Sequence, residues 1–167
     1  MMIRHALKFA APVLALAFVL GCSDASVQDA LPTLTEPGFY PLLTAQDAPS
    51  GTSRVSLSLK QVPGAVELAS VQGEITYDAA ALRLSRATLP EGMEGDAEEV
   101  SPGRVRFVGT MVQGLADTPL LHLEFTGRTA PAAAMFSVRF EEVTGGSDVA
   151  DLTSTVRSDR LLFVRAR

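Results

Sequence analysis

Apolar and polar residues alternate along several short stretches of this chain, which is the pattern of strands with one buried face. The clearest stretch runs from Ala69 to Tyr77, where Ser70, Gln72, Glu74 and Thr76 separate residues that are apolar or glycine. No apolar period of 3.6 residues persists for three helical turns, and glycine or proline separates most of the stretches. The pattern predicts an all-β sandwich of about eight or nine short strands. The predicted strands cover 39–45, 55–59, 69–77, 82–84, 105–109, 121–125, 136–140 and 161–165.

Two segments depart from this alternation. The stretch 39–45 contains Pro41, which has no backbone N–H to donate, so we expect an edge strand there. The stretch 90–103 is rich in acids and is predicted to be a long solvated loop. Its acidic residues are Glu91, Glu94, Asp96, Glu98 and Glu99. Oxygen ligands at this density make Glu94, Asp96, Glu98 and Glu99 a candidate calcium loop, but the ligand order of an EF-hand is absent, and we expect no metal or other cofactor.

The first 21 residues have the organisation of a secretory signal peptide. Arg4 and Lys8 give a positive start, and the apolar run from Phe9 to Leu20 is interrupted only by Pro12. This run is shorter than the roughly 20 apolar residues that cross a bilayer. An ordinary signal peptide with a chance cysteine, or an N-terminal membrane helix, is the alternative interpretation.

The sequence Val19-Leu20-Gly21-Cys22 resembles the lipobox of bacterial lipoproteins, although Leu20 stands where a small residue is more usual. The resemblance implies diacylglycerol on the Cys22 thiol, cleavage between Gly21 and Cys22, and usually a third acyl chain on the new amino terminus. Two or more acyl chains hold a protein firmly to a membrane. Ser23 follows the cysteine, which by the same resemblance favours the outer membrane in a diderm cell and otherwise the outer face of the cytoplasmic membrane.

The domains predicted from the sequence are a signal peptide at 1–21, a lipid-anchored flexible tether at 22–36, and a β-sandwich at 37–167. Removing 21 residues from 167 leaves 146, and the basic residues fall from 14 to 12 against 19 acids, a net charge of −7. A surface of that sign repels phosphate backbones, so nucleic acid is excluded as an expected partner. The only cysteine, Cys22, leaves no possibility of an intramolecular disulfide or a cysteine-based zinc site.

The sequence offers no catalytic set, and we expect no enzyme activity. His122 is the only histidine of the mature chain and lies mid-strand among polar positions, so no serine–histidine–acid or two-histidine metal site is indicated. We expect Tyr77 to fill the core and Asp78 to cap the following turn. Sugar-binding platforms rely on aromatic rings, and this chain has no tryptophan and only Tyr40 and Tyr77 as tyrosines.

The order of several motifs resembles that of cohesin domains. A strand from Val55 runs into the turn Val62-Pro63-Gly64, and the next strand ends in Ile75-Thr76-Tyr77-Asp78 with Leu82 following, although Ala79 replaces the family's proline. Gly103-Arg104-Val105-Arg106-Phe107 and Leu120-Leu121-His122-Leu123-Glu124-Phe125 are similar to two later strands, and Val156 to Val164 resembles the closing strand. The likeness covers about Phe39 to Val164. It implies an antiparallel jelly-roll β-sandwich of about nine strands, related to some carbohydrate-binding modules.

Cohesins bind calcium-loaded dockerins through one sheet face, so the resemblance implies a non-catalytic module for protein–protein binding at the cell envelope. The expected partner is a dockerin-like protein or another envelope protein. A carbohydrate-binding lipoprotein and a structural subunit of an envelope assembly remain the alternatives. The binding residues are unknown from sequence, with Gln72, Glu74, Thr76, Arg104 and Arg106 as candidates only.

Overall fold

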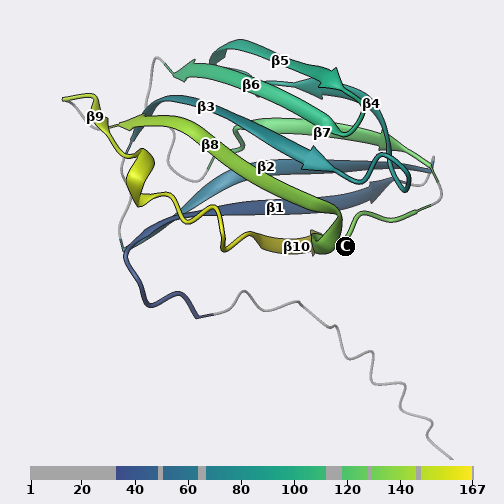
Figure 1. The fold of residues 1–167 in the computed structure, drawn as a ribbon, viewed down its shortest axis with the longest axis horizontal. Helices are drawn as coiled ribbons and strands as arrows, with labels where there is room; N and C mark the ends of the chain where they lie inside the picture. Colours follow the sequence, from purple (N-terminus) through teal and green to yellow (C-terminus); the bar gives the residue numbers. More distant parts are fainter. Residues whose placement is uncertain are drawn as a thin grey trace, which may run out of the picture.

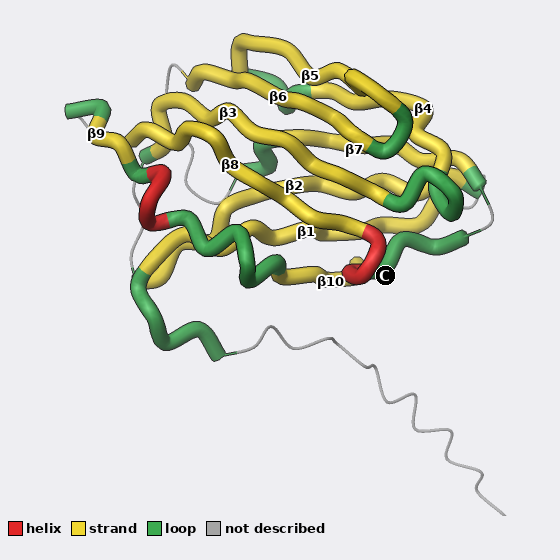
Figure 2. Tube along the Cα trace, in the orientation of Figure 1, coloured by secondary structure: helices red, strands yellow, loops and turns green. Residues whose placement is uncertain are grey.

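The computed structural model describes residues 33–48, 51–63, 67–111, 118–127, 129–145 and 148–166. Within these residues the chain forms ten strands and two short 3-10 turns, Ala133–Met135 and Thr153–Thr155 (Figure 2). The strands are β1 Gly38–Ala48, β2 Thr52–Val62, β3 Leu68–Tyr77, β4 Arg83–Thr88, β5 Met93–Ser101, β6 Arg104–Met111, β7 Leu121–Thr126, β8 Phe136–Gly145, β9 Ala150–Asp151 and β10 Leu162–Ala166. The predicted all-β class is confirmed, with more strands than the eight or nine expected.

The strands form two layers (Figure 1). Sheet I has the order β10-β1-β2-β7-β4, and sheet II has the order β5-β6-β3-β8-β9. All neighbouring pairs are antiparallel except β1 and β10, which run parallel from Leu42↔Leu162 to Gln46↔Ala166. The sandwich is therefore mixed at this one pair. The chain crosses from the β9 edge of sheet II to the neighbouring edge of sheet I, where its last strand β10 lies beside β8 and Phe163 stacks on Phe136.

The core lies between the sheets and is built from the alternating apolar residues that the sequence indicated. In β3 the inward residues Val71, Ile75 and Tyr77 are buried, while Ser70 and Thr76 on the opposite face are partly exposed. Phe125 of β7 packs edge-on against Tyr77, with ring centroids 5.1 Å apart, and against Phe136 at 5.8 Å. These contacts join the two sheets, and burial of this apolar surface is the main driving force for the fold.

The predicted edge strand at 39–45 is wrong, because β1 lies between β10 and β2. Pro41 is tolerated there because the ladder with β10 begins only at Leu42. Before that point β1 is joined to the C-terminal segment by the Phe39↔Val156 bridge and the hydrogen bond from Arg157 N–H to the Phe39 carbonyl. The missing N–H of Pro41 therefore interrupts no ladder on that side.

The predicted acidic loop at 90–103 is also wrong, because most of it forms the edge strand β5, paired with β6. Its inward positions include Gly95 and Ala97, which are too small to give an apolar alternation. Gly95 has φ +146°, and a Cβ there would overlap the Val108 carbonyl of β6, so the close approach of the two strands requires glycine. Charged side chains on such an edge also oppose pairing with another chain.

The turn after β3 forms as predicted. Tyr77 is buried, and the carboxylate of Asp78 accepts a hydrogen bond of 2.9 Å from the Ala80 N–H. The Asp78 carbonyl accepts from the N–H groups of Ala81 and Leu82. Together these bonds hold the turn that directs the chain into β4.

Candidate binding face

The outer side of sheet II, formed by β5, β6, β3 and β8, is the candidate binding face. It carries the side chains that alternate with the buried ones on these four strands. All five residues named as candidates from the sequence lie on it, because β3 and β6 are neighbours and pair Glu74 with Arg106 and Thr76 with Arg104. The main side chains of this face are Glu94, Asp96, Glu98 and Val100 of β5, Arg104, Arg106, Val108 and Thr110 of β6, Ser70, Gln72, Glu74 and Thr76 of β3, and Ser137, Arg139 and Glu141 of β8.

A ladder of polar contacts crosses the middle of this face. Arg104 Nη2 lies 2.6 Å from Glu74 Oε2, and Arg106 Nη2 lies 3.7 Å from Glu141 Oε2. Gln72 donates to the same Glu141 oxygen at 2.8 Å. The hydrogen bond from Arg104 holds the pKa of Glu74 below its ordinary value. Exposed pairs of this kind contribute only about 0–1 kcal/mol to stability, so their main effect is to orient the side chains on the face.

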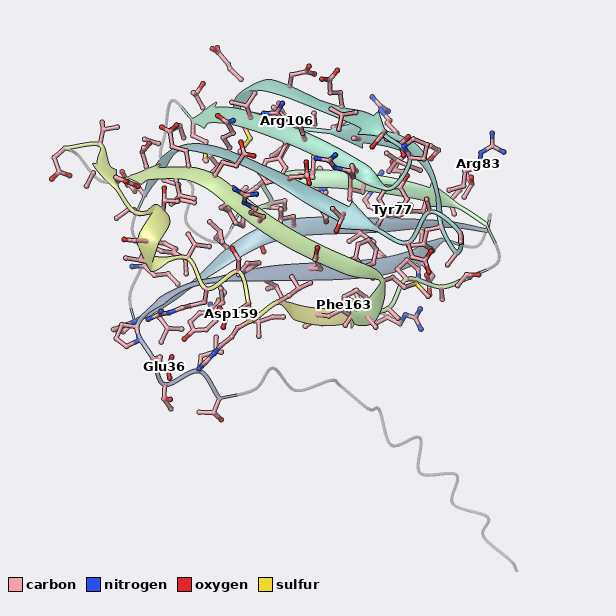
Figure 3. All side chains as sticks on the ribbon, viewed as in Figure 1. Glu36, Tyr77, Arg83, Arg106, Asp159 and Phe163 are labelled. Atoms are coloured by element: carbon pink, nitrogen blue, oxygen red, sulfur yellow. The ribbon has the colours of Figure 1, made fainter. Side chains whose placement is uncertain are left out.

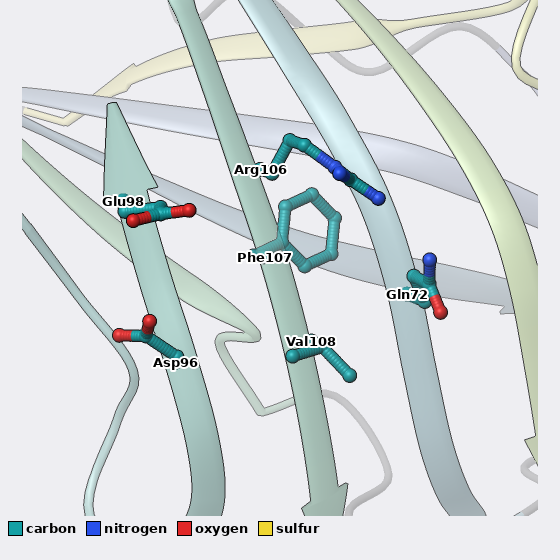
Figure 4. A pocket seen from close by; sticks show the side chains of 6 residues that line it. All are labelled: Gln72, Asp96, Glu98, Arg106, Phe107 and Val108. Carbon is teal, nitrogen blue, oxygen red and sulfur yellow. The ribbon is translucent and has the colours of Figure 1, made fainter. Parts of the chain in front are cut away.

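A hollow of about 260 Å³ opens on this face between β5, β6 and β3. Its lining residues are Gln72, Asp96, Glu98, Arg106, Phe107 and Val108 (Figure 4). Val108 is 46% exposed, and Val100 at the end of β5 is 42% exposed. These are two of the three large apolar side chains exposed in the described part of the chain, so this face combines apolar and charged surface.

The outer side of sheet I differs because part of it is covered by the chain itself. Tyr40 points to this side and is fully buried, and its hydroxyl donates to the Glu36 carbonyl at 2.8 Å. The Glu36 carboxylate lies 3.2 Å from Arg160. Figure 3 shows Glu36 on the segment that leads into β1, below the sandwich in that view. Glu36 falls within the predicted tether, so the last tether residue already contacts the domain. The described chain thus begins on the side of the sandwich opposite the candidate binding face.

The outer side of sheet I also brings together a serine and the histidine, a contact that sequence reasoning missed. His122 Nδ1 lies 2.9 Å from Ser56 Oγ because β2 and β7 pair these residues directly. Partial burial, and secondarily the charge of Arg54, lowers the pKa of His122. A triad also needs a carboxylate on the histidine, but the nearby Glu124 carboxylate accepts a hydrogen bond of 2.7 Å from Arg54. The hollow lies on the other sheet, and among the described residues no carboxylate is hydrogen-bonded to His122.

The acids of the candidate calcium loop are separated by the strand that they form. Glu94, Asp96 and Glu98 point outward from β5, whereas Glu99 points toward the sandwich and accepts hydrogen bonds from the Tyr77 hydroxyl and the Gly103 N–H. Burial, and then this bond to Glu99, raises the pKa of Tyr77. Among the described residues no group of three or more histidine, cysteine or acidic side chains is close enough to hold a metal ion.

The predicted cleavage site at Gly21 and lipidation site at Cys22 lie outside the described residues. In the described part of the chain, no helix has the length and apolar character needed to cross a bilayer.

The fold is that of cohesin modules. A type III cohesin from a cell-surface anchoring scaffoldin of Ruminococcus flavefaciens matches 77% of this chain and 87% of its own, with a TM-score of 0.53 and 13% identity. The sixth cohesin of scaffoldin B from Acetivibrio cellulolyticus, solved in complex with a dockerin, matches 77% of this chain and 99% of its own, with a TM-score of 0.52 and 17% identity. A non-cellulosomal cohesin from the archaeon Archaeoglobus fulgidus matches 78% and 92%, with a TM-score of 0.50 and 12% identity.

No protein-family model matches the sequence, and no curated protein matches it either. The matches to solved cohesin structures confirm, as a likeness of fold, the resemblance that the sequence motifs indicated.

Proposed function

We propose that this chain is a lipid-anchored envelope protein whose cohesin-like domain is a non-catalytic module that binds another protein. The observation that carries the proposal is the candidate binding face. It is a sheet surface that the described residues leave uncovered, with two exposed valines and a hollow, on a fold shared with a cohesin that was solved in complex with a dockerin. An exposed apolar patch rimmed by charged residues is characteristic of protein interaction sites.

The proposed anchor is the lipidated thiol of Cys22, formed after removal of residues 1–21. Support comes from the lipobox-like sequence and from the fact that the only cysteine of the chain stands at the position that the lipobox requires. The protein would then reside at the cell envelope, at the outer membrane of a diderm cell and otherwise on the outer face of the cytoplasmic membrane.

The course of the chain is consistent with binding through sheet II. Glu36, the last residue of the predicted tether, contacts Tyr40 and Arg160 on the outer side of sheet I. The described residues before β1 therefore lie beside sheet I and not over sheet II. The proposed partner is a protein of the dockerin kind or another envelope protein, since the Acetivibrio cellulolyticus cohesin was solved with a dockerin.

The proposal is tested with the full lipidated protein in phosphatidylcholine nanodiscs, exposed separately to a polysaccharide array and to envelope proteins of its own cell. We expect saturable retention of a protein that is lost in Val108→Arg, because an added charge and bulk would obstruct the face. The matched control is Gln46→Arg, which changes an exposed residue on the outer side of sheet I. Micromolar or tighter binding of a glycan with no protein retained would contradict the proposal.

A further inference from the structure

The hollow on the candidate binding face is lined by more acidic than basic side chains, and this excess of negative charge indicates the kind of group that binds there. Asp96 and Glu98 lie two residues apart on the same side of β5, about 7 Å apart along the strand. Val108 stands opposite Asp96, and Arg106 stands opposite Glu98. Two carboxylates therefore line the hollow together with one arginine and one exposed valine.

The guanidinium of Arg106 is directed away from these acids. Figure 4 shows it extending from β6 toward β3, while Asp96 and Glu98 stand on β5. Its ion pair is with Glu141 of β8, which is outside the hollow, and Arg104 likewise pairs with Glu74 of β3. Within the described residues Asp96 accepts a hydrogen bond only from the N–H of its neighbour Ala97, and neither Asp96 nor Glu98 has an ion pair.

The hollow suits a side chain presented by another protein. It has a volume of about 260 Å³ and opens on the outer face of the sheet. Val108 offers apolar surface for an aliphatic stem, and the carboxylates stand where the charged end of that stem would arrive. A guanidinium presents several N–H donors in a planar fork and is less strongly hydrated than an ammonium, so it suits two carboxylates better than lysine does.

We propose that this hollow receives an arginine side chain of the protein partner, with its stem against Val108 and its guanidinium between Asp96 and Glu98. This inference rests on the proposed function and specifies the chemistry of the partner. The arginine would supply the cationic partner that Asp96 and Glu98 lack among the described residues. Such charge complementarity adds specificity and speeds association as well as strengthening the complex.

The test uses two peptide libraries with identical randomised flanks and a central residue fixed as arginine or as citrulline, its neutral isostere. The full protein in phosphatidylcholine nanodiscs is offered each library at physiological ionic strength, where exposed charges beyond about 8 Å are largely screened. We expect about tenfold or greater preference for the arginine library, which the Asp96→Asn/Glu98→Gln double variant reduces to within about twofold. These exposed residues can be changed without disturbing the core.

The matched control is Glu91→Gln/Asp159→Asn, which removes one glutamate and one aspartate charge from exposed sites elsewhere. It should keep the arginine preference. Equal retention of the two libraries, or an equal loss of preference in the control, would overturn the inference. A protein retained by the wild type and lost in Val108→Arg, together with equal library retention, would leave the proposed function standing and refute only the arginine.

Discussion

Replacing Ile75 by alanine tests whether β3 presents the faces described above. Ile75 is fully buried in the centre of sheet II, paired with Val105 on one side and Val138 on the other. Both neighbours are held in ladders, so the cavity left by the substitution cannot collapse freely. We expect a loss of about 2–5 kcal/mol in the free energy of unfolding, from lost burial and the remaining cavity.

Glu74→Ala is the matched control because it changes the preceding residue, on the opposite face of the same strand. It removes one exposed ion pair with Arg104, whose contribution is about 0–1 kcal/mol. In urea titrations with a slope of about 1–3 kcal/mol per molar, a loss near 3 kcal/mol moves the midpoint by roughly 1–3 M. Because both variants share the same slope, the control should move the midpoint by at most about a third as much. Equal shifts for the two variants would show that the assignment of faces on β3 is wrong.

Three further predictions concern the anchor, strand packing and acid stability. Cys22→Ala should abolish incorporation of a fatty-acid probe, and label that persists would contradict the lipoprotein proposal. Gly73→Ala should destabilise the fold more than Gly109→Ala in thermal melts. A Cβ at Gly73 would lie 2.6 Å from a backbone carbonyl of β8, whereas a Cβ at Gly109 would meet the Met93 side chain, which can move. The reverse order of stability would refute this prediction. The pKa of His122 is lowered in the folded protein, so as the pH falls the unfolded chain binds a proton at this histidine before the folded chain does. The free energy of unfolding should therefore decline as the pH falls below about 6.5. His122→Gln should flatten this decline between pH 7 and 5.5, and an unchanged slope would disprove the assignment.

The sequence predicted the central strands well because their alternation of apolar and polar residues follows directly from the burial of one face of the strand. A strand such as β3, with one face in the core, needs an apolar or small residue at every second position. The face on which each side chain lies can then be predicted from the strand's own sequence, without information on the neighbouring strands. The same logic correctly placed Gln72, Glu74 and Thr76 on one face and Arg104 and Arg106 on another strand of similar pattern.

The edges were harder to predict because they depend on neighbours. β5 is read as a loop from its sequence, since Gly95 and Ala97 fill its inner side and Glu99 turns inward to meet Tyr77. Only the backbone of β6 explains why small residues suit those positions. β1 was wrongly predicted to be an edge strand for a related reason. Whether the missing N–H of Pro41 costs a hydrogen bond depends on where the ladder between β1 and β10 begins.

Part of the candidate binding face was missed for the same reason. The alternation in β6 places Val108 outward with Arg106, a signal that the sequence contains. The hollow itself arises where β3, β5 and β6 pair, and this brings Gln72 and Asp96 to the two sides of Val108. Such register between strands far apart in the chain is set by packing of the whole sandwich and is absent from any local pattern.

The most direct test of the central claim is site-specific photo-crosslinking in living cells. The photoreactive amino acid p-benzoylphenylalanine replaces Val108 on the candidate binding face in one strain and Gln46 on the outer side of sheet I in another. We predict a discrete protein adduct from position 108 and none from position 46, because the partner docks on sheet II. An adduct from position 46 alone, or none from either position, would contradict the account.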